Sequence, residues 1–511
     1  MTIRLDNIKL KIGESEDMLL EAARKKMRGF KRFGIIKKSL DARDKSNIFW
    51  VYSVWVSDEE ELPCAQPEKL KNPPAVAVIG SGPAGLFCAL RLVEHGFKPI
   101  IIERGERVED RKRSTEKFFE SGKLDENSNV QFGEGGAGTF SDGKLNTQTH
   151  DNLNRDVLKL FKRFGAPEEV VYLNKPHIGS DKLYEVLKNI RAYIEECGGQ
   201  YLFNKKFCGF VKSGDGFKAL LLQNVRTGEC SEIKAECAVL AVGHSARDTF
   251  IMLDKSGVVM QPRDFALGVR IEHLSSEIGL AQYGKNYIKL PAADYKLVSR
   301  AHERTVFTFC MCPGGVVIPS SSEQGGVVTN GMSLYSRSGE NSNSALMVQM
   351  KQEDFDSEGL FAGMEFQRAI ERRAFDLCGK NYKAPVQLCG DFLRGRVSDG
   401  FKSIKPTYAA GVSFVPLDAV LPKITVEALK AAIPDMDRRL NGFANPDAVL
   451  TGVETRFSSP LRILRGEDCQ SVSMKGLYPC GEGSGYSGGI TSSAADGLKI
   501  AELIFEKYKN H

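Results

Sequence analysis

The clearest pattern of hydrophobic positions lies between residues 76 and 103. Val76–Ile79 is an uninterrupted apolar run, and Pro99–Ile102 is a second one. The segment between them, Leu86–His95, has apolar residues at helical spacing, namely Leu86, Ala89, Leu90 and Val93. Uninterrupted apolar runs of this length are typical of strands buried on both faces. The pattern therefore predicts a strand–helix–strand unit with parallel strands.

The first 70 residues have a different pattern and predict a separate small unit. Alternating or apolar segments predict strands at Ile3–Ile12, Gly34–Leu40 and Ile48–Val56, and Glu14–Met27 has the spacing of an amphipathic helix. Glu59–Pro74 is charged and rich in proline, as expected for a linker. We expect residues 1–70 to form a small ferredoxin-like α+β domain.

The rest of the chain predicts an α/β protein with one large insertion. Short alternating strands in Tyr201–Leu240 predict a β-meander that leads into the buried strand Ala238–Val242. Residues 265–445 are less regular and predict an inserted mixed α+β domain. We therefore expect a doubly wound nucleotide-binding domain in two parts, 74–264 and 446–511, with the insert between them.

Three glycines stand between the first apolar strand and its helix. Gly80, Gly82 and Gly85 satisfy G-x-G-x-x-G, and Glu103 follows the second strand. In such a unit the first glycine permits a tight turn, the second lets a diphosphate approach the backbone, and the third lets helix and strand pack closely. An acid at the position of Glu103 accepts hydrogen bonds from ribose hydroxyls. The combination favours a dinucleotide site over an ordinary glycine-rich turn.

Composition narrows the class of protein. Of the 511 residues, 42% are hydrophobic and 26% charged, and 70 basic residues against 65 acidic ones leave a net charge of +5. This balance does not favour nucleic acid, and we interpret the basic segment Arg24–Lys38 as a solvated helix face and strand edge. The 12 cysteines include no C-x-x-C pair, and no metal-ligand spacing occurs. With no signal peptide and no membrane-length apolar run, we expect a cytoplasmic protein without a membrane span.

Three segments resemble the glutathione-reductase-like FAD/NAD(P)-binding flavoprotein superfamily. They are Gly80–Glu103 with Arg104, the strand Ala238–Val242 ending in Gly243, and Leu477–Gly483, where Glu482 stands at a position that is usually aspartate in that superfamily. Further segments are similar to the bacterial NAD(FAD)-utilising, or FAD-dependent, dehydrogenases, namely Phe132–Leu145, Pro176–Asp181, Met311–Gly315 and Gly481–Ser493. The resemblance implies bound FAD and an oxidoreductase.

The resemblance also assigns the residues around the cofactor. The glycine-rich stretch Phe132–Leu145 is expected to lie against FAD, and the helix after Gly481–Ser493 is expected to direct its N-terminus toward the flavin ring. The residues expected to bind FAD are Gly80, Ser81, Gly82, Pro83, Ala84, Gly85, Glu103, Arg104, Gly135, Gly136, Ala137, Gly138, Thr139, Gly243, Gly481, Glu482, Gly488, Gly489 and Ile490.

The residues that take part in catalysis are less evident. Lys144 is a candidate for a charge near the flavin or the substrate, and His244 follows a strand end where the superfamily places cofactor contacts. Cys312 is a candidate redox thiol, although an apolar neighbourhood favours a core role, and Arg456 is a candidate for binding an acidic group or for a structural ion pair. For His177 and His273 structural roles are favoured.

These features predict an FAD-dependent oxidoreductase that passes a hydride or an electron pair through FAD, with a substrate pocket between the FAD domain and the insert. The lack of a second complete dinucleotide unit predicts that NAD(P)H, if used, docks transiently as a donor. Two alternatives stay open. One is a mainly structural FAD in a protein that acts in RNA binding or assembly through residues 1–70, and the other is a reductase or saturase of lipid or polyprenyl substrates.

Overall fold

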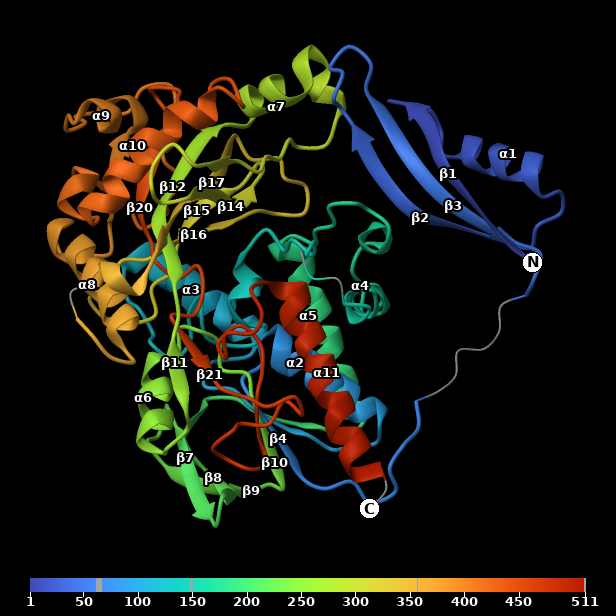
Figure 1. Ribbon diagram of the computed structural model, residues 1–511, viewed down its shortest axis with the longest axis vertical. Helices are drawn as coiled ribbons and strands as arrows, with labels where there is room; N and C mark the ends of the chain where they lie inside the picture. Colours follow the sequence, from blue (N-terminus) through green and yellow to red (C-terminus); the bar gives the residue numbers. More distant parts are fainter. Residues whose placement is uncertain (61–66, 148, 150, 356, 510–511) are drawn as a thin grey trace.

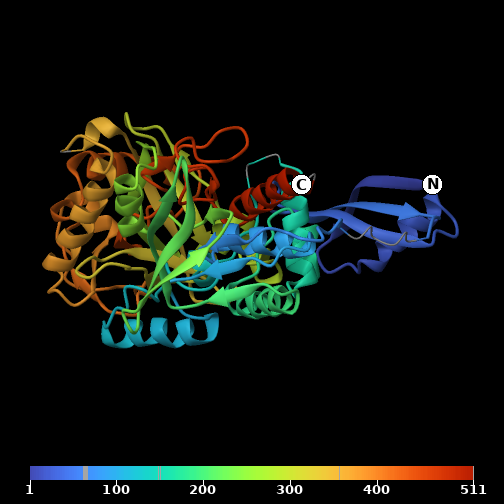
Figure 2. The same cartoon turned by 90° about the horizontal axis from the view of Figure 1, so that it is seen from below.

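The computed structural model describes residues 1–60, 67–147, 149, 151–355 and 357–509, so residues 61–66 of the expected linker lie outside the described part. The N-terminal unit is a three-stranded antiparallel sheet of order β1-β3-β2 with one helix, and it projects from one end of the molecule (Figures 1 and 2). Its elements are β1 Thr2–Lys11, α1 Asp17–Lys26, β2 Arg32–Asp41 and β3 Phe49–Ser57.

The core of the N-terminal unit lies between α1 and one face of its sheet, where Leu19 of the helix packs with Tyr52 and Val54 of the central strand. The strand order and the helix correspond to the first four of the six elements of a ferredoxin-like unit, and residues 1–60 hold neither its second helix nor its fourth strand. The free edge of β2 touches the rest of the chain, because Lys38 exchanges backbone hydrogen bonds with Tyr172 and Asn174.

The central unit contains a five-stranded parallel sheet of order β22-β10-β4-β5-β6. The strands are β4 Val76–Ile79, β5 Ile100–Ile102, β6 Gln200–Leu202, β10 Cys237–Leu240 and β22 Leu477–Pro479. β4 occupies the range expected from its apolar run, and all four of its residues are buried. Since the strands are parallel, their carboxyl ends meet at one edge of the sheet, where ligands of such folds bind.

Helices cover one face of this sheet and a meander covers the other. α2 Pro83–Glu94, α5 Ser180–Glu196 and α11 Ile490–Lys509 share one apolar cluster with the sheet. Gly497 of α11 lets this helix touch α2, since a Cβ there would lie 2.1 Å from the Ala84 carbonyl oxygen. The opposite face packs against the meander and α6, whose bounds are β7 Lys205–Ser213, β8 Gly216–Asn224, β9 Cys230–Lys234 and α6 Arg247–Lys255.

The sequence predicted a doubly wound domain with a β-meander. In the structure the chain passes from β6 to β10 through that meander, which together with α6 covers the second face of the sheet. Two further helices lie between β5 and β6, namely α3 Val108–Ser121 and α4 Leu153–Arg163.

The insertion builds a seven-stranded mixed sheet of order β13-β14-β17-β12-β20-β18-β19. Its strands are β12 Phe265–Leu274, β13 Val298–Ser299, β14 Val306–Cys312, β17 Asn341–Met350, β18 Ala384–Leu388, β19 Val412–Phe414 and β20 Val449–Glu454, with a separate hairpin of β15 Val316–Pro319 and β16 Thr329–Met332. The expected insert, 265–445, ends before this sheet does, because β20 pairs with β12 and β18.

The helices of the insert lie at the end of the molecule away from the N-terminal unit, except α7, which reaches toward it (Figure 1). They are α7 Ser275–Tyr283, α8 Ala362–Leu377, α9 Cys389–Arg394 and α10 Lys423–Asp437. A two-stranded ribbon of β11 Met260–Pro262 and β21 Leu461–Ile463 carries the chain into and out of the insert. Within the described residues no helix combines the length and apolar character needed to cross a membrane. The described part of the chain also holds no cluster of three or more side chains suited to a metal ion.

Candidate functional site

The turn after β4 and the first residues of α2, together residues 80–85, are shaped by two glycines. Gly80 has a φ of +100°, and a Cβ there would lie 2.3 Å from the Ala241 carbonyl oxygen. A Cβ at Gly85 would lie 2.0 Å from the carbonyl oxygen of Gly80. Both positions therefore exclude side chains because of the chain's own packing, as the glycine spacing predicts.

Gly82 is different, because the protein itself leaves room beside it. Its φ of −71° suits any residue, and a Cβ there would approach only the Gly136 Cα atom, at 3.8 Å. Gly82 is also the N-cap of α2, whose first N–H groups have no partner within the helix. Open space at a helix N-terminus with free N–H donors suits an anion such as a diphosphate.

A second glycine segment, Gly133–Phe140, lies directly against this loop. The Gly135 N–H donates to the Ser81 carbonyl at 2.9 Å, and a Cβ at Gly136 would lie 3.0 Å from the Gly82 Cα atom. Gly136, Ala137 and Gly138 are partly exposed, whereas Thr139 is buried. The sequence placed this segment against the cofactor, and the structure brings it to the loop expected to hold the diphosphate.

The third segment, Gly481–Ile490, leads from β22 into α11. A Cβ at Gly481 would lie 2.6 Å from the Ala84 Cβ, so this segment also contacts the first turn of α2. Gly488 borders open space, and the Ile490 side chain lies 3.2 Å from where Gly138 would carry a Cβ. We call Gly80–Gly85, Gly133–Phe140 and Gly481–Ile490 together the glycine cradle. The N-termini of α2 and α11 both belong to it.

The end of β10 supplies the remaining expected contacts. Gly243 has a φ of +74° with open space beside it, and Gly483 packs on its backbone. The Nδ1 atom of His244 lies 3.4 Å from Glu482, which is 29% exposed, and the Nε2 atom of His244 has no hydrogen-bond partner in the described chain. His244 and Glu482 therefore keep polar capacity for a ligand at this edge of the sheet.

Glu103 is buried and its carboxylate is fully used by the chain. Oε2 accepts hydrogen bonds from the Ser81 N–H (2.9 Å) and hydroxyl (2.7 Å). Oε1 accepts from the N–H groups of Gly105 (2.9 Å) and Gly133 (3.1 Å). The sequence predicted contact with a ribose. The structure adds a role that spacing did not reveal, in which Glu103 ties two segments of the glycine cradle together.

We predict that Glu103→Gln lowers the free energy of unfolding by about 2–4 kcal/mol, because the amide NH₂ replaces an oxygen that accepts two buried hydrogen bonds. Urea unfolding of the purified variant measures this change. Glu116→Gln is the matched control, since the Glu116 side chain is 57% exposed on α3. Equal stability of the two variants would contradict the role of Glu103 as a tie.

The side chain of Arg104 is held by partners on other elements. Its guanidinium donates to both carboxylate oxygens of Asp248, at 3.2 and 2.9 Å, and to the Thr249 hydroxyl at 2.9 Å. The same group lies over the Phe132 ring, 4.4 Å from its centroid. The positive charge of Arg104 outweighs the burial of Asp248 and lowers the pKa of that carboxyl. Arg104, which the sequence predicted to bind FAD, is thus held in place by Asp248.

Sequence reasoning missed Arg111, a fully buried residue of α3 that supports the cradle. Its guanidinium donates to five backbone carbonyls and one hydroxyl, those of Asn129, Val130, Gly133, Glu134, Gly136 and Thr139. Burial lowers the pKa of Arg111 to about 10. The only signal in the sequence is its helical spacing from Val108, Thr115 and Phe118, which marks the inward face of α3.

Lys144 lies where the central unit meets the insert. Its ammonium group donates to the Met311 carbonyl and lies 3.9 Å from Asp142. Asp142 also pairs with Arg337 of the insert. Burial alone would raise the pKa of Asp142, but the charges of Arg337 and Lys144 outweigh it and lower that pKa. We call this contact the junction.

The other candidate side chains have structural partners. Arg456 makes two hydrogen bonds to Glu371, at 2.8 and 2.9 Å, inside a buried ion cluster. His273 is buried with Nε2 2.8 Å from the Phe443 carbonyl, and burial lowers its pKa to about 4. His177 lies 3.0 Å from the Tyr335 carbonyl, and Cys312 is buried in β14. Arg456 and His273 are therefore held as parts of the framework.

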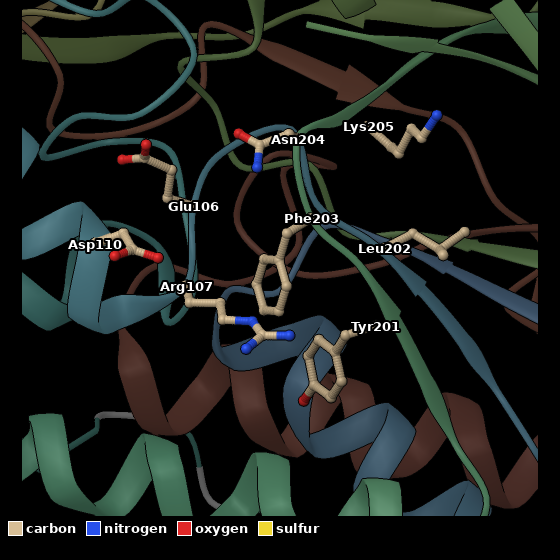
Figure 3. Close-up of a pocket in the computed structure, with 8 residues that line it drawn as sticks. All are labelled: Glu106, Arg107, Asp110, Tyr201, Leu202, Phe203, Asn204 and Lys205. Carbon is tan, nitrogen blue, oxygen red and sulfur yellow. The ribbon is translucent and has the colours of Figure 1, made fainter. Parts of the chain in front are cut away.

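A surface pocket of about 360 Å³ lies beside the ends of β5 and β6 (Figure 3). Figure 3 shows the Arg107 guanidinium beside Phe203 and Tyr201, with Glu106 and Asp110 on the α3 side. None of the residues expected to bind a cofactor lines this pocket. We therefore place the candidate site at the glycine cradle and not here.

Two family models match the chain. Residues 78–110 match a model described as an NAD(P)-binding Rossmann-like domain, and residues 264–457 match one described as FAD-dependent protein, C-terminal domain-like. The first match contains the loop at Gly80–Gly85 and Glu103, and the second contains the inserted sheet from β12 to β20. The chain is therefore similar to a Rossmann-like nucleotide-binding domain in residues 78–110 and to the C-terminal domain of an FAD-dependent protein in residues 264–457.

Solved structures resemble the chain only distantly. The glycerol-3-phosphate dehydrogenase of Bacillus halodurans, complexed with FAD, has 11% identity and a TM-score of 0.38, and the match covers 86% of this chain and 66% of that one. A flavoprotein/dehydrogenase of Cytophaga hutchinsonii has 12% identity and a TM-score of 0.39, with 86% and 79% covered.

A relative from Clostridium beijerinckii is much more similar. This protein, which bears the description uncharacterized protein, is 44% identical over 537 residues, and the alignment covers 99% of each chain. The alignment spans nearly the whole chain and therefore the regions that hold the glycine cradle and the junction. The chain therefore belongs to the same family as the Clostridium beijerinckii protein.

Proposed function

We propose that the protein is an oxidoreductase that holds FAD in the glycine cradle. The observation that carries the proposal is the meeting of three glycine segments and two helix N-termini at the carboxyl edge of a parallel sheet. Gly82 keeps space open beside the free N–H groups of α2, which suits the diphosphate. The order of strand, helix, strand and meander also supports membership of the glutathione-reductase-like superfamily.

FAD, when bound, supplies the transfer of a hydride or an electron pair between two molecules. The chain contributes the surroundings of that chemistry. The first turn of α11 offers N–H groups and the positive end of a helix dipole, which favour negative charge beside them. The Thr491 hydroxyl in this turn donates to the Leu145 carbonyl at 2.7 Å and so fixes the helix end beside the junction.

The reacting molecules are proposed to enter between the central unit and the insert. Lys144 brings a positive charge to this junction, where its ammonium group also contacts the Met311 carbonyl and lies near Asp142, and His244 keeps its Nε2 atom without a partner in the described residues. We propose these two residues as the side chains that contact reacting atoms. A nicotinamide donor, NADH or NADPH, is proposed to dock from the insert side.

The test combines cofactor identification with anaerobic reduction. We expect purified protein to be yellow, to release FAD and not FMN on denaturation, and to lose its flavin absorbance when NADH or NADPH is added without oxygen. A colourless protein that does not take up added FAD would overturn the cofactor. If bound FAD is reduced by dithionite but not by NADH or NADPH, the proposed nicotinamide donor is overturned. That result would favour a mainly structural FAD.

A further inference from the structure

Two cysteines occupy an irregular end of β14 at the junction. β14 pairs with β17 in register up to Phe309, and the pairing shifts before Cys312. Cys310, inside this irregularity, has a φ of +39°, which is unusual for a residue with a side chain. Such bulges redirect a side chain out of the strand pattern, and strained backbone of this kind occurs at functional sites.

Contacts from three directions hold this bulge in place. The Cys310 carbonyl accepts a hydrogen bond from Arg270 at 2.9 Å and one from the Cys312 thiol at 3.2 Å. The Met311 carbonyl between them accepts the Lys144 ammonium. The two cysteine side chains also lie close enough to change each other's pKa.

Charged groups surround the bulge. Arg270 and Lys144 favour a thiolate at Cys310, whereas Asp142 opposes it. Arg270 also pairs with Glu454 at 2.7 Å. His177 adds no charge, because burial lowers its pKa. The two cations therefore assign the thiolate to Cys310.

The environment of the two thiols agrees with this assignment. The hydrogen bond from Cys312, helped by the charges of Arg270 and Lys144, lowers the pKa of Cys310 to about 6, whereas the same pairing and burial raise the pKa of Cys312. Cys310 is partly exposed and Cys312 is buried. One thiol is thus prepared as a thiolate and its neighbour as a thiol, as in a reactive dithiol.

We propose that Cys310 and Cys312 form a redox pair that exchanges an electron pair with FAD and serves a thiol or disulfide substrate. The proposal rests on the proposed function. The Cys310 thiolate and the Cys312 thiol form an S–S bond and release one proton and two electrons, which reduce oxidised FAD. Thr491 places the first turn of α11 one residue from Lys144, which in turn holds Met311 between the cysteines.

Electron counting tests the pair in the holoprotein. Air-oxidised protein, titrated anaerobically with dithionite, is expected to take up four electrons per FAD, two for the flavin and two for the disulfide. Cys310→Ser and Cys312→Ser are expected to take up two. Cys208→Ser and Cys230→Ser, which change exposed cysteines of the meander, are the controls and are expected to take up four. Uptake of two electrons by the unchanged protein would overturn the proposal.

A second measurement does not depend on the flavin. Trypsin releases residues 305–337 as one peptide that contains Cys310 and Cys312 and no other cysteine. From air-oxidised protein this peptide is expected to resist alkylation and to gain two alkyl groups only after reduction. Alkylation of both cysteines without reduction would contradict the redox pair even if FAD is bound. A disulfide in a protein that binds no flavin would refute the exchange with FAD and the proposed function, while leaving the cysteine pair in place.

Discussion

Replacing Arg111 with methionine is expected to lower the free energy of unfolding by about 3–5 kcal/mol, the range found when one partner of a buried polar network is removed. The guanidinium is fully buried and serves five carbonyls of residues 129–136. Methionine fills similar volume but donates no hydrogen bond, so these carbonyls lose a buried donor. Urea unfolding followed by circular dichroism measures the change.

The same variant is expected to lose FAD, since Gly133–Phe140 forms one side of the cradle. Arg113→Met is the matched control, because Arg113 lies on the same helix with a side chain that is 79% exposed and pairs with Asp110 at 3.2 Å. An exposed pair of this kind contributes little, so the control should stay within about 0.5 kcal/mol of the unchanged protein. If both substitutions change the free energy of unfolding and the FAD content equally, Arg111 does not support the cradle.

Replacing Gly82 with valine is expected to abolish FAD binding in a protein that still folds. The backbone at Gly82 is extended, and a Cβ there meets only Gly136 Cα at 3.8 Å, so the chain tolerates a side chain. That side chain fills the space at the N-terminus of α2 and keeps a diphosphate from its N–H donors. Loss of two or three charge-assisted hydrogen bonds weakens binding on the order of 1000-fold or more.

Flavin content after purification and titration of the apoprotein with FAD measure this loss. Stability of the apoprotein should change by about 1 kcal/mol or less, since valine replaces glycine at a helix N-cap. Gly400→Val, at a position with open space and no positive φ, controls for the substitution itself. Normal flavin content in Gly82→Val would contradict the cradle as the diphosphate site.

The sequence predicted those parts of the fold whose signal is local. β4 and β5 lie within the apolar runs at Val76–Ile79 and Pro99–Ile102, because strands buried on both faces are uniformly apolar. The inserted sheet could not be found in this way. Its central strands bury polar side chains, such as Arg270 of β12 and Asn343 of β17, whose partners lie on other strands far along the chain. In β12 apolar and polar residues alternate from Leu267 to Glu272, but both faces are buried, so the alternation wrongly suggests that the polar face is exposed.

The candidate site divides in the same manner. Glycine spacing located the cradle, because tight turns and close backbone contacts require glycine. The buried Arg111 that supports the cradle has no such requirement that the sequence reveals. Arg111 stands in a run with Lys112 and Arg113, and only the fold decides which of the three points inward. Arg104 shows the same limit, since the sequence marked it as a cofactor residue but could not reveal its partner Asp248, which lies on α6.

The packing of α11 on α2, with β22 beside β10, sets an order for biosynthesis. A nascent chain carries α2 before the insert is made, whereas β22 and α11 are translated only after the insert. Domains generally fold as units during synthesis, so the inserted sheet is expected to settle while its host is still unfinished. The cofactor is then expected to bind only after α11 has been made. Chains truncated before α11 would leave the ribosome without the cofactor.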